Sequence, residues 1–426
     1  MLLVVLACAT PEAPPPVARV AGSAEQPDIV ILVASGLRAD TSEPGAEAVF
    51  YEALGHEPST RFSAAYAQSC TPHTSFGSML TGRYPSSIPL CAMVSGSSLT
   101  PAAQQPWCST LPPGTTGMAE VAKAYGYSTG AYVADVTKGY SSDWEVLEET
   151  AAAWWSEHSG PRLYLVMVSD LHMLQYRPSV ALRPEPDKAE RERIDLAAVA
   201  EDYRRVTRSV GEGLSRVLDV LPSDDRWVFV TSTNGLSLGE RTGVKSDHLG
   251  AVTHGIIVDR TVRVPLAILE PAPGRGEVDD VVELIDLVPT IAELVGGVAP
   301  AGLTGRSLLA SGPDPAPYAY AEFGDMLSLR EGSDFLALRW FLHNASSLDL
   351  RLTDGLLEAT IGSDAFTLHD VERDPLQEED LVMEQPERAE ELRALMVEVR
   401  TGPGAPPETD RSRIEALQLQ SADGYW

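Results

Sequence analysis

The side chains best suited to chemistry lie in one short stretch, residues 67–85, with the sequence AQSCTPHTSFGSMLTGRYP. Cys70 and Thr71 carry a thiol and a hydroxyl that could attack an ester. The following residues favour a helix with Ser75 as its N-cap. A helix that starts there would present free backbone N–H groups to an anion. We interpret the stretch as a nucleophile loop followed by an anion-binding helix start.

Further polar residues follow predicted strands. Ser35 and Gly36 come directly after one apolar run, and Thr233 and Asn234 come shortly after another. A hard cation such as Ca²⁺ or Mg²⁺ prefers oxygen ligands, and carboxylates supply the charge that retains it. Ser and Thr hydroxyls are neutral and are poor substitutes for carboxylates.

Hydrophobic patterning predicts the elements that position these residues. Short β-branched runs predict buried strands at 28–34, 163–168, 227–230 and 264–269. Apolar residues spaced by three or four predict a helix over 196–221. A second helix is predicted over 278–295, because acidic residues lie near its start and Gly296 follows its end. Strands that alternate with helices indicate a doubly wound sheet, whose ligands lie at the carboxyl ends of its strands.

The pattern changes after about residue 310. Segments 335–341 and 366–369 indicate a small antiparallel sheet, and 386–399 reads as a helix. We therefore expect a leader and Pro/Ala linker over 1–27, an α/β domain over 28–310 and a C-terminal subdomain over 311–426.

Several blocks, in order, resemble the sulfatase family of the alkaline phosphatase superfamily. The resemblance covers about residues 27–424, and its implied fold is a mostly parallel doubly wound sheet flanked by helices, with a smaller C-terminal antiparallel sheet plus helix. The blocks are Leu37-Arg38-Ala39-Asp40, Ser75 to Pro85, Tyr125 to Gly130, Asp170-Leu171-His172, Thr231 to Gly235, His254-Gly255, Arg263 to Leu266, Asp286 to Thr290, Gly305 to Leu308 and His369-Asp370.

The resemblance implies hydrolysis of sulfate or phosphate esters with a divalent metal, but the family's charged positions are altered here. Its metal-binding Asp residues fall on Ser35, Gly36 and Thr233, so the resemblance leaves Asn234 as the only plausible metal ligand. Its nucleophile stands ten residues before Gly82 and falls on Pro72, which has no nucleophilic atom. His172 keeps its block, and His254 occupies a position where the family has Lys or His.

Three hypotheses follow. The first is a pseudo-sulfatase that has lost its metal and is retained for binding or scaffolding. The second is an active sulfuric or phosphoric ester hydrolase with a rearranged site, a bound Ca²⁺ or Mg²⁺, and Thr71 or Cys70 as nucleophile. The third is a metal-free esterase with His172 or His254 as base. In each, an anionic small molecule or a sulfated or phosphorylated ester is the expected ligand, bound near Ser75, His172 and His254.

Charge and the N-terminus limit the other partners. The chain has 32 basic and 61 acidic residues, a formal net charge of −29, and this field repels nucleic acid, anionic lipid and sulfated polysaccharide at long range. Val5-Leu6-Ala7-Cys8 resembles a bacterial lipobox, so we expect an exported cell-envelope lipoprotein that meets the membrane only through a lipid at Cys8. Cys91 and Cys108 could pair in an oxidising compartment.

Overall fold

The computed structural model describes residues 26–39, 45–88, 115–134, 142–172, 174, 196–223, 225–238, 257–269, 274–309, 318–323, 326–338 and 366–401. Cys8, Cys91, Cys108 and His254 lie outside these residues. Within the described part, no helix is both long and apolar enough to cross a membrane.

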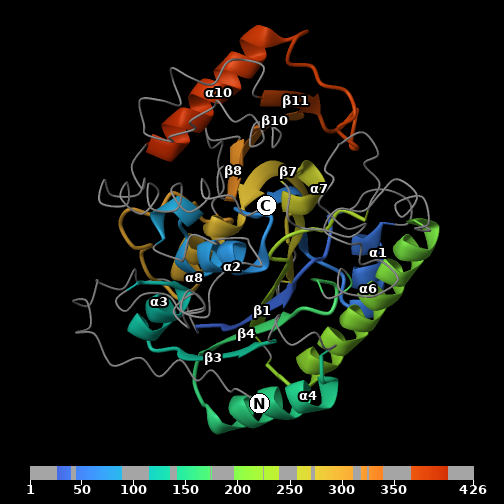
Figure 1. Cartoon of the computed structure of the whole chain (residues 1–426). Helices are drawn as coiled ribbons and strands as arrows, with labels where there is room; N and C mark the ends of the chain where they lie inside the picture. Colours follow the sequence, from blue (N-terminus) through green and yellow to red (C-terminus); the bar gives the residue numbers. More distant parts are fainter. Residues whose placement is uncertain are drawn as a thin grey trace, which may run out of the picture.

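Seven of the described strands form one sheet in the order β3-β4-β1-β5-β6-β2-β7 (Figure 1). All neighbours are parallel except β6, which runs antiparallel to both β5 and β2. The strands are β1 (Asp28–Ala34), β2 (Thr60–Tyr66), β3 (Ser128–Val133), β4 (Arg162–Val168), β5 (Arg226–Thr231), β6 (Arg263–Leu269) and β7 (Gly276–Glu283).

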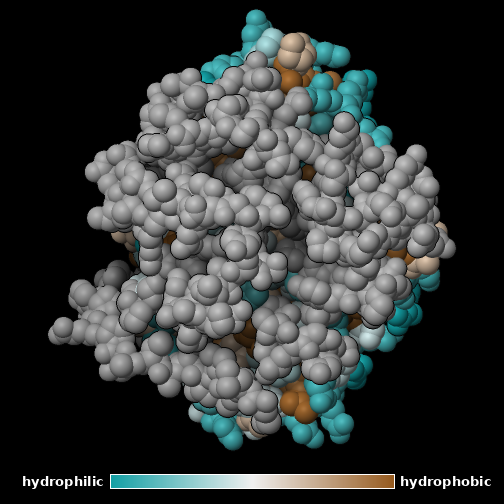
Figure 2. Space-filling model, in the orientation of Figure 1, coloured by the Kyte–Doolittle hydropathy of each residue, from teal (hydrophilic) through white to brown (hydrophobic). Residues whose placement is uncertain are grey.

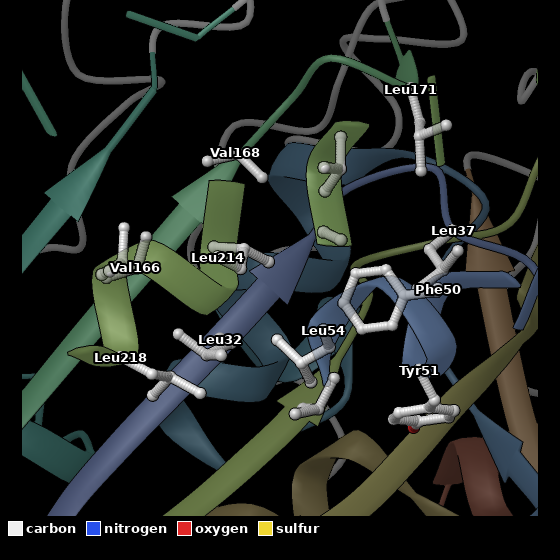
Figure 3. Packing of buried hydrophobic residues seen from close by; sticks show 14 of the residues in the cluster. Leu32, Leu37, Phe50, Tyr51, Leu54, Val166, Val168, Leu171, Leu214 and Leu218 are labelled. Carbon is white, nitrogen blue, oxygen red and sulfur yellow. The ribbon is translucent and has the colours of Figure 1, made fainter. Parts of the chain in front are cut away.

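The fully buried strand β1 divides the core into two layers, because its side chains alternate between the faces of the sheet. Leu32 and its alternate neighbours pack with helices α1 (Ala46–Leu54), α4 (Trp144–Glu157) and α6 (Leu196–Asp219). Figure 3 shows Leu214 and Leu218 of α6 beside Leu32. Ile31 and the opposite set pack with α2 (Pro72–Thr81), α3 (Met118–Ala124) and α8 (Leu287–Leu294).

Four described strands near the C-terminus form a separate antiparallel sheet in the order β11-β10-β9-β8, with α10 (Pro386–Thr401) against it (Figure 1). The strands are β8 (Tyr318–Phe323), β9 (Met326–Glu331), β10 (Asp334–Leu338) and β11 (Phe366–Asp370). Figure 2 shows mainly hydrophilic described residues at the top of the view, where α10 lies. The expected fold class is therefore confirmed: a doubly wound, mostly parallel sheet flanked by helices, with a smaller antiparallel sheet plus helix.

The predicted helix over 278–295 is wrong in its first half. Residues 276–283 form β7, which pairs in parallel with β2 at the edge of the main sheet. The valines at 278, 281 and 282 are β-branched and buried, and this favours a strand packed on the sheet over a helix. The one-turn 3-10 helix η4 (Leu284–Asp286) then leads into α8, and Gly296 follows with φ +75°.

Helices α1 and α6 pack closely because α6 has a glycine at their contact. A Cβ atom on Gly211 would lie 2.7 Å from the carbonyl oxygen of Phe50 and 2.8 Å from the Cβ of Ala53. Neither neighbour is the flexible end of a long side chain, so the two helices would have to move apart.

We predict that Gly211→Ala lowers the free energy of unfolding, measured by guanidinium denaturation, by about 1–2 kcal/mol. Alanine normally stabilises a helix interior by up to about 1 kcal/mol relative to glycine, so a loss here reports the helix contact. Glu212→Ala, at the exposed neighbouring position, is the matched control and should leave stability nearly unchanged. A stabilised Gly211→Ala variant would contradict the packing described.

Candidate functional site

Three loops meet at the carboxyl edge of the main sheet. The backbone N–H of Gly36, after β1, donates to the carbonyl of Asn234, after β5, at 3.1 Å. Gly235 N donates to Thr261 O at 2.9 Å and Ala67 N donates to Val262 O at 2.7 Å. The loops after β1, β5 and β2 are thus fixed to one another and to α7 (Asp259–Val262). The predicted positions at the sheet edge therefore come together, as the doubly wound topology requires.

Ser35, Thr233 and Asn234 form a continuous chain of neutral hydrogen bonds. The Ser35 and Thr233 hydroxyl oxygens are 2.8 Å apart, and Thr233 Oγ1 donates to Asn234 Oδ1 at 2.9 Å. Asn234 Nδ2 donates in turn to the carbonyl of Gly235 at 2.7 Å. All three side chains are buried, with exposed fractions of 1% or less. In the part of the chain that the structure describes, the hydrogen-bond partners of these three side chains are neutral groups.

Two residues that the sequence analysis did not single out support this chain. Ser232 Oγ accepts from the backbone N–H groups of Gly36 and Leu37, each at 3.1 Å, and donates to Asn234 O at 2.6 Å. Tyr203, on α6, donates its hydroxyl to Gly36 O at 2.7 Å and accepts from Arg38 N at 2.9 Å. Ser232 could have been predicted from the sequence, because it directly follows a predicted strand. Tyr203 has the spacing of an ordinary core residue and gave none.

Gly36 has no room for a side chain. Its φ of +91° lies in the left-handed region, which L-residues with a Cβ atom rarely adopt. A Cβ atom there would also lie 2.9 Å from the backbone nitrogen of His172 and 3.2 Å from the carbonyl carbon of Leu171. An aspartate at this position would require the backbone to move.

His172 lies beside this turn through its backbone. Its N–H donates to Ser35 O at 3.2 Å, and its side chain is buried. Asp170, two residues earlier, accepts from the backbone N–H and the hydroxyl of Ser142 at 2.8 and 2.5 Å. The structure therefore brings His172 to the same edge as Ser35 and assigns Asp170 to a hydrogen-bonded loop contact.

The predicted N-cap at Ser75 is wrong. Helix α2 begins at Pro72, with Thr71 as the N-cap residue in an extended conformation. Proline is favoured at the first helical position because its φ suits the helix and its missing N–H needs no partner there. Ser75 lies within the first turn, where its N–H donates to Thr71 O at 3.1 Å. The N-terminal end of the helix, and with it the predicted anion-binding position, is therefore near Thr71.

The hydroxyls of Thr71, Ser75 and Ser78, at the start of α2 and along it, differ in their hydrogen bonds. Thr71 Oγ1 donates to Thr74 Oγ1 at 3.0 Å and lies 3.3 Å from Ser69 Oγ. Ser75 Oγ and Ser78 Oγ are buried and make no hydrogen bond within the described residues. Ser78 lies one turn beyond Ser75, and the sequence analysis assigned it no role.

Cys70 is a poor nucleophile in this environment. It is fully buried in an apolar cluster with Tyr66, Val262 and Phe335, between the main sheet and the C-terminal sheet. Burial raises the pKa of the Cys70 thiol far above its ordinary value, because the thiolate would lose its hydration. A protonated thiol attacks slowly, since the thiolate is the reactive species.

The described residues do not fit a divalent cation. They contain no group of three or more His, Cys, Asp and Glu side chains arranged to hold a metal ion. At the sheet edge, the positions where the resemblance implies acidic ligands carry two neutral hydroxyls, which bond directly to each other, and a glycine. A cation between those hydroxyls would have to break their hydrogen bond, and none of these positions supplies a carboxylate to offset its charge.

Comparison with known proteins identifies the fold. No family model and no curated protein matches the sequence. Among solved structures, the 2-O GAG sulfatase BT1596 matches with a TM-score of 0.63 and 16% identity, over 88% of this chain and 92% of that one. The phosphonate monoester hydrolase of Agrobacterium radiobacter matches with a TM-score of 0.59 and 14% identity, over 93% and 96%. This chain has the sulfatase fold.

A third structure with this fold, BT4656, is in complex with its substrate D-glucosamine-2-N,6-O-disulfate. It matches with a TM-score of 0.59 and 13% identity, over 89% of this chain and 99% of that one. The sulfatase fold thus spans nearly the whole length of these neighbours, at identities that leave the chemistry of each site to be argued from its own residues.

We predict that Gly36→Ala destabilises the protein by about 2–4 kcal/mol, since it combines a left-handed backbone with overlap against the His172 backbone. Gly55→Ala is the matched control, because Gly55 has φ +70° but open space where a Cβ atom would lie. That variant should lose about 1 kcal/mol. If guanidinium denaturation gave the same loss of unfolding free energy for Gly36→Ala and Gly55→Ala, the crowding at Gly36 would be contradicted.

We also predict that Cys70 resists alkylation. In the native protein at pH 8, iodoacetamide should label Cys70 at least about 100-fold more slowly than in the unfolded chain, because labelling requires opening of the structure. Peptide mass mapping distinguishes Cys70 from the other cysteines. Labelling of native Cys70 at the unfolded rate would show an accessible thiol and would restore it as a candidate nucleophile.

Proposed function

We propose that this protein is a sulfatase-superfamily member that has lost metal-dependent ester hydrolysis and acts by binding or scaffolding. The observation that carries the proposal is the direct 2.8 Å hydrogen bond between Ser35 and Thr233. It joins two positions at which the sequence resemblance implies metal-binding carboxylates. Neutral groups that bond to each other occupy the place where a charged set would be needed.

Electrostatics explains why such losses would occur together. A buried carboxylate without its cation costs several kcal/mol, so loss of the metal alone would strand charge inside the protein. Replacement of the acidic ligands by Ser35, Gly36 and Thr233 removes the negative charge together with the cation. The buried hydrogen bonds through Thr233 and Asn234 then satisfy the remaining polar atoms.

An active hydrolase with a rearranged site remains the second candidate, because α2 begins directly after a residue with a hydroxyl, Thr71. Thr71 places a buried hydroxyl at the N-terminal end of this helix, next to the backbone N–H groups of its first turn. The same N–H groups could hold an anionic sulfated or phosphorylated ligand without turnover. Thr71 is the stronger nucleophile candidate, since the Cys70 thiol lies in an apolar cluster.

We place the protein at the cell envelope, as an exported lipoprotein anchored at Cys8. The lipobox-like Val5-Leu6-Ala7-Cys8 and the Pro/Ala-rich residues that follow support this proposal. Export of a tethered binding protein fits a strongly acidic surface, which keeps the folded part away from anionic headgroups.

The test of the proposal is hydrolysis of an aryl sulfate and an aryl phosphate by the full chain, with Ca²⁺, Mg²⁺, Mn²⁺ and Zn²⁺ supplied in turn. We predict no turnover above the rate of the Cys70→Ala/Thr71→Ala double variant with any metal. Metal-dependent turnover that disappears in Thr71→Ala would overturn the proposal in favour of the active hydrolase.

A reconstruction strengthens this test. Ser35→Asp with Thr233→Asp returns two carboxylates to the sheet edge, and we predict at least about tenfold tighter Ca²⁺ binding by calorimetry than in the parent protein. The matched control is Ser35→Asn with Thr233→Asn, which has the same shape without charge and should gain no affinity. Equal Ca²⁺ binding by the two double variants would show that these positions do not form a metal site.

A further inference from the structure

A buried carboxyl at the end of β7, that of Glu283, joins three parts of the molecule. Its Oε1 accepts from the backbone N–H of Tyr320, on β8, at 2.9 Å and from Gln68 Nε2, in the loop before α2, at 3.3 Å. Its Oε2 accepts from the Tyr84 hydroxyl at 2.9 Å. One side chain therefore ties the main sheet to the C-terminal sheet and to the loop that leads into α2.

A second set of contacts runs beside this one. Glu322 N, on β8, donates to Gln68 O at 2.9 Å, and the Glu322 carboxylate accepts from Ser86 N at 2.5 Å and from the Tyr320 hydroxyl at 3.0 Å. The backbone of Gln68 is thus held by β8 while its side chain is held by Glu283. Glu283 and β8 therefore both contact the segment just before Cys70 and Thr71.

The charged groups around Glu283 come from several elements. Asp286, on η4, accepts from the backbone N–H groups of Glu283 and Arg306 at 2.9 and 2.8 Å. Arg306 donates from its guanidinium to Val281 O at 2.8 Å. A cavity of about 30 Å³ lies between these groups, large enough for water to exchange a proton with the carboxyl. Its lining consists of Tyr84, Val281, Glu283, Asp286, Thr304, Arg306 and Tyr318.

This environment disfavours the charged form of Glu283. Burial, and next the charge of Asp286, raise the pKa of Glu283 to about 8. Hydrogen bonds from Tyr320 N, Tyr84 and Gln68 act in the opposite direction and do not offset the burial. In the closed junction Glu283 therefore binds its proton more tightly than a hydrated glutamate does.

We propose that Glu283 is a proton-controlled joint, which in its neutral form holds the C-terminal sheet and the loop before α2 against the main sheet and in its charged form loosens both. Opening the junction would expose the carboxylate to water, which removes the cost of burying its charge, so ionisation favours the open state. This inference concerns the junction and does not depend on whether the site at the sheet edge hydrolyses esters.

The direction of the pH dependence follows from linkage. The closed form has a pKa of about 8 at Glu283, and a hydrated glutamate has a pKa of about 4.3. The stabilisation by the bound proton is complete below the lower value, is lost progressively as the pH rises to about 8, and changes little above it.

The test compares the full chain with Glu283→Gln, whose amide retains the shape of the neutral acid but does not titrate. In denaturant unfolding at pH 5, 6, 7 and 8, the unfolding constant of the parent relative to that of Glu283→Gln should rise about tenfold per pH unit between pH 5 and 7. Glu293→Gln, at an exposed position on α8, is the matched control and should follow the parent. A pH-independent ratio would overturn the proposal.

Hydrogen exchange would test whether the pH effect lies at the junction. After correction for the intrinsic pH dependence of exchange, the amides of Tyr320 and Glu322 should lose protection between pH 5 and 8 in the parent and keep it in Glu283→Gln. Unchanged protection of these two amides in the parent would refute a local joint.

Tyr84→Phe provides an independent variant, which is decisive if Glu283→Gln fails to fold. It removes a hydrogen bond that favours the charged carboxyl, so it should extend the pH-dependent range of stability to higher pH. A loss of stability that is equal at every pH would mean that the contact is purely structural, and it would contradict the joint.

Discussion

A divalent cation at the carboxyl edge of a parallel sheet needs negatively charged oxygen ligands, and here the described side chains of Ser35, Thr233 and Asn234 are neutral groups that bond to one another. The hydrogen bond between Ser35 and Thr233, continued to Asn234, fixes the loops after β1 and β5 side by side. In a buried site, such a neutral network avoids the desolvation cost that an uncompensated carboxylate would impose. This is the arrangement expected if, as we propose, the sulfatase fold has been kept without metal-dependent hydrolysis.

The surrounding structure is adapted to this neutral arrangement. Ser232 and Tyr203 satisfy the backbone groups of the turn after β1, and the left-handed Gly36 lets that turn lie against the His172 backbone. A return of acidic residues at 35 and 233 would leave the crowding at Gly36 in place. The turn is thus shaped by close packing as well as by the identity of its polar side chains.

The sequence predicted the core strands well and the transitions between elements less well. The run 28–34 coincides with β1, because a fully buried parallel strand has a continuous apolar signal. Residues 278–283 were wrongly predicted as helix because two acidic residues precede a long apolar stretch. They form a strand because they pair with β2, and this pairing leaves no local signal in the sequence. The start of α2 was predicted at Ser75 because serine is a common N-cap residue. The helix begins at Pro72 instead, and proline is equally characteristic of the first helical position.

The site was predicted in part for a similar reason. Ser35, Thr233 and Asn234 follow strands, so topology alone brings them together, whereas the roles of Tyr203 and Glu283 depend on contacts across the fold that have no local pattern. The central claim is that the natural protein holds no metal at this edge. Its most direct test is elemental analysis of the full-length protein, purified from its own cells without chelators. We expect less than about 0.1 Ca, Mg, Mn or Zn ion per chain after gel filtration, whereas about one tightly held ion per chain, lost on mutation of Asn234, would contradict the account.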